Sequence, residues 1–564
     1  DKLSNYVIFN SKFALGHKWR AIKPKTQSNI HLIFPLSIFK PSAPSSKGKS
    51  TMSFPSLKYA VPVFTAVFAA YIGIKIYGLF RVPKGIKNIP AIPLFTTLGY
   101  MLKGIPFDVR EEHTINAILT EEGLARKWQR GEWVISLADP DFAKQFLTNI
   151  DTFPKALGEM DIFRRNKESS FARFLGGDTI LFSNGETWKR YRMFSNRAFN
   201  PAVDTKYFGY FAIKMFAEIQ RNGSLVEFRN LSQRITLDIM GKYMFGTDFQ
   251  ALDDQFSKYA EAYNHIVDSA SDPLFIIFPF LEKMTYLFPK CAVVHKALDD
   301  MDELFYGIIE RKRVEHRDPN YRSREDKSKD ILDLMMEAED SENGTQLSPQ
   351  ELRDNMAIFF IAGHDTTSSS LTNAVYYLAK YKDIQRKVRE EIIRVLGDEP
   401  KDIIPSLKET KEMSYLTMVL REVLRMNPSA GELPPRIATE SFQLGRHNIP
   451  AGTLLSIDIH CLMHNPKIWG DDAEAFIPER HEPQRLKQMT NNVWSWLPFS
   501  GGPRKCVGMN MAMAEMRTIL AMLLKRYEFD LPEGSIHADK IQLRPGDLPL
   551  QVPLDMHIRF AKRY

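Results

Sequence analysis

The chain has 564 residues, of which 44% are hydrophobic and 25% are charged, so its composition excludes a wholly disordered protein and allows one or two domains with a large core. It contains three cysteines, Cys291, Cys461 and Cys506, and no CxxC pair. This pattern excludes a disulfide framework and a zinc site built from cysteines.

The positive net charge is concentrated at the N-terminus. Residues 1–51 hold nine basic residues and one acid, a balance of +8 against +7 for the whole chain. The remaining chain is therefore nearly neutral, and no nucleic-acid partner is predicted because such a partner needs a concentrated cationic face. The first methionine is Met52, and we expect residues 1–51 to be a basic leader outside the functional protein. A mitochondrial presequence is the alternative, because the segment contains serines and almost no acids.

Residues 52–81 are predicted to form an N-terminal membrane anchor. Residues 59–80 are almost wholly apolar, and as a helix they would extend about 33 Å, enough to cross a bilayer. Arg81, Lys84 and Lys87 follow, so the positive-inside rule places the rest of the chain in the cytosol. A buried core helix is the alternative. We expect a single-pass protein of the endoplasmic reticulum, with a mitochondrial location as the lesser alternative.

A proline-rich hinge is expected at residues 82–95, followed by one domain over residues 96–564. The fold class predicted for this domain is mainly α with a small β region. Ser348, Pro349 and Glu351 form a capping pattern that predicts the start of a long helix. Short β-branched stretches predict a minor sheet around residues 437–459. The strongest helical patterns cover residues 355–381, 414–426 and 507–529.

The stretch FSGGPRKCVG, residues 499–508, places Cys506 just before a predicted helix, where the free N–H groups favour a thiolate. A small buried hydrophobic residue is one interpretation of this cysteine. A nucleophile would need a histidine base, and the Walker spacing of a phosphate loop is missing. A metal or haem ligand remains, with Arg504 and Lys505 available for an anionic group on the same cofactor.

A family resemblance rests first on this stretch. Phe499, Gly502, Arg504, Cys506 and Gly508 match the signature FxxGxRxCxG, so the chain resembles the cytochrome P450 family. The resemblance covers about residues 85–564 and points to the microsomal eukaryotic, fungal-like type. It implies the family fold and haem b (iron protoporphyrin IX), with Cys506 as the axial iron ligand and with Gly502 and Gly508 allowing the backbone to approach the porphyrin closely.

The segment AGHDTT, residues 362–367, is similar to the family's central helix. The resemblance implies that Gly363 leaves room for the porphyrin and dioxygen. Thr366 would then hydrogen-bond bound dioxygen, and Asp365 would relay protons. The alternative for Thr366 is a hydrogen bond to the backbone of its own helix.

Two further sets of residues match the family. Glu422 and Arg425 lie one helical turn apart, and with Arg480 they resemble the family's buried charge network. The family usually has an aromatic residue where this chain has His481. The resemblance also implies side chains that contact the haem propionates, namely Trp188, Arg192, Arg436 and Arg504.

The resemblance implies a monooxygenase that inserts one oxygen atom from O2 into a hydrophobic substrate. We expect a steroid, fatty acid, terpenoid or xenobiotic, because the expected contact regions are rich in apolar and aromatic residues. These regions are residues 153–163, 273–280, 359–360 and 431–435. Residues 273–288 are expected either to dip into the membrane or to belong to the core.

Only 58 residues follow Cys506, so we expect electrons from a separate NADPH-dependent reductase, with cytochrome b5 as a further donor. Two alternatives share the haem-thiolate site. One is an isomerase or dehydratase, against which the proton-relay pair Asp365 and Thr366 argues. The other is a non-catalytic haem-binding membrane protein.

Overall fold

The computed structural model describes residues 73, 77–78 and 80–564, with gaps at 104, 115, 130–131, 157–168, 200–202, 255–257, 271, 273, 276–278, 323–328, 342–346, 489–491 and 545–549. The predicted leader and almost all of the predicted anchor lie outside these residues. Within the described part of the chain, no helix is both long and apolar enough to cross a membrane.

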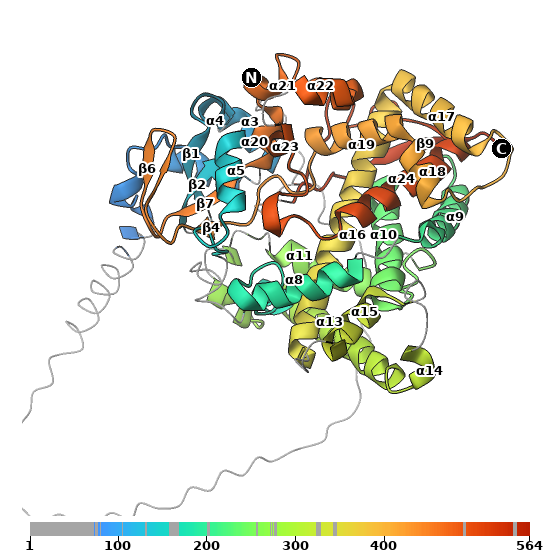
Figure 1. Cartoon of the computed structure of the whole chain (residues 1–564), viewed down its shortest axis with the longest axis horizontal. Coiled ribbons are helices and arrows are strands. Elements are labelled where there is room, and N and C mark those ends of the chain that lie inside the picture. Colours follow the sequence, from blue (N-terminus) through green and yellow to red (C-terminus); the bar gives the residue numbers. More distant parts are fainter. Residues whose placement is uncertain are drawn as a thin grey trace, which may run out of the picture. The chain divides into compact units, whose positions relative to one another are not determined.

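The long helix α16 (Pro349–Lys380) runs through the middle of the fold (Figure 1). Its start was predicted correctly: the Ser348 Oγ accepts a hydrogen bond from the Glu351 N–H, and the Glu351 carboxylate accepts one from the Ser348 N–H. Most of its residues are buried, because α10 (Phe228–Phe245), α19 (Ser414–Met426) and α24 (Met509–Arg526) pack around it.

The other helices surround this centre. They are α2 (Leu94–Leu102), α3 (Phe107–Thr114), α4 (Asn116–Glu122), α5 (Pro140–Thr148), α7 (Ser170–Leu175), α8 (Gly185–Phe199), α9 (Thr205–Asn222), α11 (Lys258–Ala270), α13 (Pro289–Glu315), α14 (Pro319–Arg322), α15 (Ile331–Ser341), α17 (Lys382–Leu396), α18 (Leu407–Glu412), α20 (Ile459–His464), α21 (Pro466–Trp469), α22 (Pro483–Gln488), α23 (Asn492–Ser495) and the 3-10 turns η1 (Lys84–Ile86), η2 (Pro279–Lys283), η4 (Pro478–His481) and η5 (Gly502–Arg504).

The strands form three small sheets within the described residues. The largest has the order β1-β2-β7-β4 and lies at one end of the body, on the left of Figure 1. The others have the orders β3-β9-β8 and β5-β6. The bounds are β1 (Leu124–Gln129), β2 (Glu132–Leu137), β3 (Leu225–Glu227), β4 (Arg436–Ile437), β5 (Phe442–Leu444), β6 (His447–Ile449), β7 (Leu454–Ile457), β8 (Tyr527–Asp530) and β9 (His557–Lys562).

One sequence prediction about these elements needs correction. The helix predicted over residues 507–529 ends at Arg526, because residues 527–530 pair with β9 as strand β8.

The segment 82–95, predicted as a proline-rich hinge, packs against the folded body. Its Ile86, Ile89 and Ile92 are buried, and the Ile92 N–H donates to the Arg126 carbonyl of β1 at 3.0 Å.

Candidate active site

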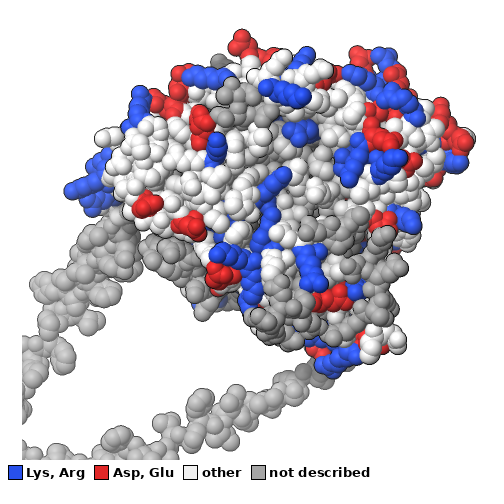
Figure 2. All heavy atoms as spheres, viewed as in Figure 1, with Lys and Arg blue, Asp and Glu red and all other residues white. Residues whose placement is uncertain are grey.

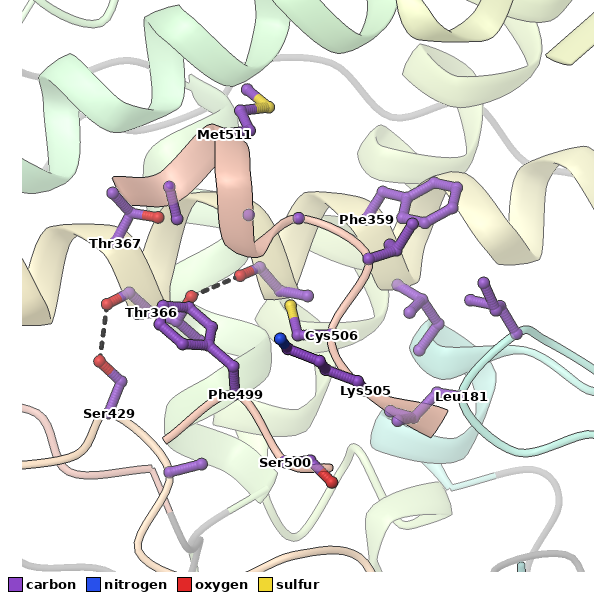
Figure 3. A pocket seen from close by; sticks show the side chains of 18 of the residues that line it. Leu181, Phe359, Thr366, Thr367, Ser429, Phe499, Ser500, Lys505, Cys506 and Met511 are labelled. Atoms are coloured by element: carbon purple, nitrogen blue, oxygen red, sulfur yellow. Dashed lines mark hydrogen bonds between the residues drawn. The ribbon is translucent and has the colours of Figure 1, made fainter. Parts of the chain in front are cut away.

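A cavity of about 300 Å³ lies between α8, α16, α24 and the loop that carries Cys506. Figure 3 shows Cys506 and Thr366 pointing into this space from the loop and from α16. Much of the wall consists of aliphatic, aromatic and methionine side chains, namely Ile180, Leu181, Phe199, Met240, Met244, Ile358, Phe359, Leu424, Leu433, Pro434, Met511 and Met516. Such a wall suits a large, mostly apolar ligand.

Cys506 lies in the turn before α24 and presents its sulfur to the cavity. Its N–H donates to the Phe499 carbonyl at 2.9 Å, which holds the loop closed. Burial raises the pKa of the Cys506 thiol, while backbone hydrogen bonds from Gly508 and Met509 and the positive charge of Arg192 oppose this rise. The thiolate is therefore stabilised only in part by the protein, and a bound metal cation would supply the rest.

Arg192, Arg504 and Lys155 bring positive charge to the same cavity. None of the three forms an ion pair with a carboxylate of the described residues. Arg192 donates to the Lys505 carbonyl at 2.7 Å, and Arg504 donates to the Ser183 carbonyl at 2.8 Å and stacks on the Trp188 ring at 4.0 Å. These contacts hold the Arg192 and Arg504 side chains at the cavity wall and leave their positive charges without a negative partner.

The cations repel one another, and this shows in their pKa values. Burial, together with the charges of Arg436 and Arg192, lowers the pKa of Arg504 to about 9. Burial and the charges of Arg436 and Arg504 lower the pKa of Lys155 well below its ordinary value. Unneutralised cations around a largely apolar cavity fit a ligand that carries carboxylates on an apolar body, as haem does.

The structure separates the side chains that the sequence suggested as propionate contacts. Arg192, Arg504 and Trp188 line the cavity, whereas Arg436 does not. Arg436 is buried in β4, where it donates to the carbonyls of Phe146 and Phe153 at 3.3 and 3.4 Å, so it acts on the cavity through its charge. Sequence reasoning did not single out Lys155, because one lysine in a loop carries no motif. An isolated antiparallel β-bridge between the backbones of Lys155 and Arg436 places Lys155 at the cavity.

The α16 residues lie as follows. Thr366 lines the cavity, but its hydroxyl donates to the Ala362 carbonyl at 2.6 Å, which is the alternative considered from the sequence. The Thr366 carbonyl accepts from Ser429 at 2.7 Å and from Ser370 at 2.9 Å. Because its carbonyl has these other donors, the helix backbone at Thr366 is not held by the regular hydrogen-bond ladder alone.

Asp365 points away from the cavity. It is buried, and its carboxylate accepts a hydrogen bond from the Tyr263 hydroxyl of α11 at 3.2 Å. Arg229 is close enough for the Asp365 charge to act on it. Asp365 and Thr366 are therefore neighbours in α16 that face different surroundings.

The three glycines that match the family, Gly502, Gly508 and Gly363, have different surroundings. Gly502 has φ +66°, and a Cβ there would lie 2.6 Å from the Leu147 carbonyl oxygen of α5. It is not among the cavity-lining residues, and its described contacts are with α5, so the approach of Gly502 to the cofactor stays a prediction. Gly508 does line the cavity. A Cβ on Gly363 would collide with the end of the Met240 side chain.

Glu422 of α19 is the centre of a buried network. The Arg425 guanidinium donates to both of its oxygens at 2.8 and 2.9 Å, and the His481 Nε2–H donates to it at 2.9 Å. Arg480 is an outer member: its Nε lies 3.5 Å from Glu422, while its Nη1 donates to Asp472 at 2.7 Å. His481, the departure from the family pattern, thus takes part in the network directly.

Only some residues of the predicted substrate-contact regions line the cavity. Phe359, Leu433 and Pro434 line the cavity, whereas Phe360 is buried in the core against His364. The described residues of the region 273–280 are not part of the wall.

The comparison with protein families decides the identity of the fold. The family model "Cytochrome P450" matches residues 125–551, which is more than half of the chain. The chain belongs to the cytochrome P450 family. As a cytochrome P450 it is an oxidoreductase of the haem-thiolate monooxygenase class. The Cys506 loop and the apolar, cation-lined cavity fit the haem that this family uses.

Named cytochrome P450 proteins are among its relatives. The chain is 31% identical to "Cytochrome P450 4F5" of Rattus norvegicus over 64% of this chain and 71% of that protein. It is 26% identical to "Cytochrome P450 4A7" of Oryctolagus cuniculus over 85% of this chain and 91% of that protein. "Protein LUTEIN DEFICIENT 5, chloroplastic" of Arabidopsis thaliana is 29% identical over 74% of this chain and 69% of that protein.

Proposed function

We propose that this cytochrome P450 hydroxylates a hydrophobic substrate with oxygen from O2, with haem b held by Cys506 in the cavity described above. The haem supplies the iron centre at which O2 is activated. When haem is bound, Cys506 would supply its sulfur ligand, and Arg192, Arg504, Lys155 and Trp188 would hold its propionates. The observation that carries this proposal is the thiol in one cavity with cations that have no carboxylate partner among the described residues.

Thr366 and Asp365 are proposed to manage protons at the O2 site. Thr366 reaches the cavity and can turn its hydroxyl from the Ala362 carbonyl to a ligand. The Asp365 carboxylate lies on the buried side of α16, where it accepts a hydrogen bond from the Tyr263 hydroxyl. We propose that Asp365 gains and loses its proton on that side. This division of roles is consistent with their different surroundings.

The substrate is proposed to be a fatty acid, steroid, terpenoid or lipophilic xenobiotic. The support is the apolar wall that Phe359 and Ile358 of α16 share with Met240 of α10 and with Leu433 and Pro434. Burial of apolar surface is worth about 25 cal/mol per Å², so such a wall favours lipophilic compounds broadly and does not choose among them.

Electrons are proposed to come from a separate NADPH-dependent reductase, with cytochrome b5 as a second donor. Lys and Arg side chains gather on the surface over α8, next to the Cys506 loop (Figure 2). A groove there is lined by Lys189, Arg192 and Arg197. Positive charge at this place favours an acidic redox partner and raises its rate of association.

Association with the membrane of the endoplasmic reticulum is part of the same proposal. Phe280, Tyr286 and Leu287 are exposed by 61%, 76% and 56% in the segment before α13, whereas Phe275 is buried. Large exposed apolar side chains with nearby lysines are typical of a surface that contacts lipid. Co-sedimentation with phospholipid vesicles tests this contact, and protein that stays in the supernatant would argue against it.

The proposed activity is tested with purified protein, haem and a reductase. Lipophilic compounds are first screened for a shift in the haem spin state, which needs no reductase. A compound that binds should then stimulate NADPH consumption and yield a product that carries oxygen from labelled O2. An unlabelled, isomerised or dehydrated product would contradict the monooxygenase proposal.

Thr366→Ala is expected to lower product formed per NADPH by about tenfold or more, because a positioned hydroxyl contributes strongly to proton transfer. The missing electrons should appear as hydrogen peroxide, while haem content stays that of the unmodified protein. Thr366→Ser, which keeps the hydroxyl, should restore most of the product. If Thr366→Ala formed as much product per NADPH as Thr366→Ser and the unmodified protein, the Thr366 hydroxyl would have no part in the mechanism.

Lys155→Met is expected to weaken haem retention about 10- to 100-fold, because a hydrogen bond to a charged group contributes roughly 1.5–3 kcal/mol. The rate of haem transfer to an acceptor protein measures this. Lys144→Met is the matched control, because Lys144 is exposed on the preceding helix α5. If both variants retained haem equally, Lys155 would have no part in holding it.

A further inference from the structure

Ser429 lies in the loop between α19 and β4 and lines the active-site cavity, where only 8% of its surface is exposed. Its hydroxyl lies 2.7 Å from the Thr366 carbonyl oxygen and 2.7 Å from the Ser370 hydroxyl, both in α16. Figure 3 shows the Ser429 side chain pointing towards this helix. A residue outside α16 therefore holds the carbonyl group of the residue that we place at the O2 site.

The carbonyl of Thr366 is held in an unusual way for a helix. In a regular α-helix a carbonyl accepts from the backbone N–H four residues later. Here the Ser370 hydroxyl also donates to the Thr366 carbonyl at 2.9 Å, and the Ser429 hydroxyl donates to it at the best length for an O–H donor. Hydroxyl donors of this kind bend a helix locally, so the position of the Thr366 side chain depends on how its carbonyl is held.

The loop that carries Ser429 is fixed on its other side. The Ser429 carbonyl accepts a hydrogen bond from the Gln551 N–H at 2.9 Å, and an isolated antiparallel β-bridge joins Ala430 to Leu550. Ala430 and Leu433 of the same loop line the cavity. Ser429 thus connects a wall that a substrate would touch to the backbone of α16.

We propose that Ser429 is a positioning residue that links this substrate-facing wall to Thr366. The inference rests on the proposed monooxygenase function, in which Thr366 acts at the O2 site. A substrate that presses on Ala430 or Leu433 moves the loop, and the Ser429 hydroxyl passes the movement to the Thr366 carbonyl. The Thr366 hydroxyl, which donates to the Ala362 carbonyl at 2.6 Å, is thereby placed for a ligand when the wall is occupied.

The infrared stretch of carbon monoxide bound to the reduced haem tests the placement of Thr366 without turnover. Ser429→Ala is expected to shift or broaden this band, because the Thr366 carbonyl loses its donor from the loop. Ser429→Thr keeps the hydroxyl and should keep the band. Ser429→Cys, whose thiol is a weak donor of similar size, should shift the band in the same direction and serves if Ser429→Ala does not fold.

Ser232→Ala is the matched control. The Ser232 hydroxyl of α10 also contacts α16, at 3.2 Å from the Ser368 carbonyl and 2.7 Å from the Thr372 hydroxyl. Ser232 is buried but does not line the cavity, so its variant loses the same kind of helix contact and should leave the band unchanged. An unchanged band in Ser429→Ala and Ser429→Cys, or an equal shift in Ser232→Ala, would overturn the proposal.

A double-mutant comparison tests the link to the wall. Leu433→Ala is expected to shift the carbon monoxide band in the unmodified protein and to shift it less when Ser429→Ala is already present, because the connection is then broken. Equal shifts in the two backgrounds would show that the wall acts without Ser429 and would overturn the link.

Turnover gives a further measurement. Ser429→Ala should form about 2- to 10-fold less product per NADPH than Ser232→Ala, the range expected for one lost hydrogen bond, with kcat lowered more than KM is raised. Equal product per NADPH in the two variants would overturn the role of Ser429 in the reaction. Failure of the proposed function is recognised differently: the unmodified protein would then transfer no labelled oxygen, although Ser429→Ala still shifts the carbon monoxide band.

Discussion

Replacing Cys506 with serine is expected to abolish the red-shifted absorption band of the reduced, carbon monoxide-bound protein. The band depends on a thiolate ligand, and a serine hydroxyl cannot donate comparable electron density to iron. Product formation should fall to the background of free haem. The measurement is a carbon monoxide difference spectrum of variant and unmodified protein at equal haem concentration.

Cys291→Ser is the control for this prediction. Cys291 is buried at the start of α13 and does not line the cavity, so its replacement should leave the carbon monoxide band unchanged. A red-shifted band that survives in Cys506→Ser, or one that is lost in Cys291→Ser, would contradict the assignment of Cys506 as the axial ligand.

Glu422→Gln is expected to cost about 3–5 kcal/mol in the free energy of unfolding, because the change leaves the buried charge of Arg425 without its partner. The Arg425 and Glu422 side chains are fully buried, and Glu422 also accepts from the Ile477 backbone N–H at 3.0 Å. Denaturant unfolding measures the change. Glu479→Gln is the control: its pair with Lys387 is partly exposed, and its loss should cost about 1 kcal/mol or less. Similar losses in the two variants would contradict a central role for Glu422.

The same network predicts a pH dependence. Burial works to raise the pKa of Glu422, but hydrogen bonds from His481 and Arg425 outweigh it and lower this pKa to about 2, below the ordinary 4.5. A lowered carboxyl pKa stabilises the folded protein fully above the unfolded value. This stabilisation should be lost as the pH falls from about 4.5 to 2, and the loss should be absent in Glu422→Gln. An equally steep loss in the variant would assign the acid sensitivity to other carboxyls.

The sequence predicted the features that depend on residues close together along the chain. The capping pattern of Ser348 and Glu351 predicted the start of α16, because a capping box needs only one helical turn. The turn before α24 that carries Cys506 and the Glu422–Arg425 pair were likewise local patterns. The mainly helical fold and the cytochrome P450 family followed from these patterns together.

Contacts between distant segments decided what no local pattern could show. Strand pairing ended α24 earlier than its periodicity predicted, and the α5 backbone accounts for Gly502. A backbone bridge to Arg436 of β4 places Lys155 at the cavity, and the fold makes His481 a hydrogen-bond donor to Glu422.

Glu515 shows the same limit most clearly. Within α24 it is one acid in a helical run, and only the packing of the surrounding helices removes water from its carboxyl. The sequence by itself thus determined the fold class, the family and the position of Cys506, which we propose as the sulfur ligand. The tertiary structure decided which charges lack partners, because pairing and desolvation depend on neighbours that lie far away in the chain.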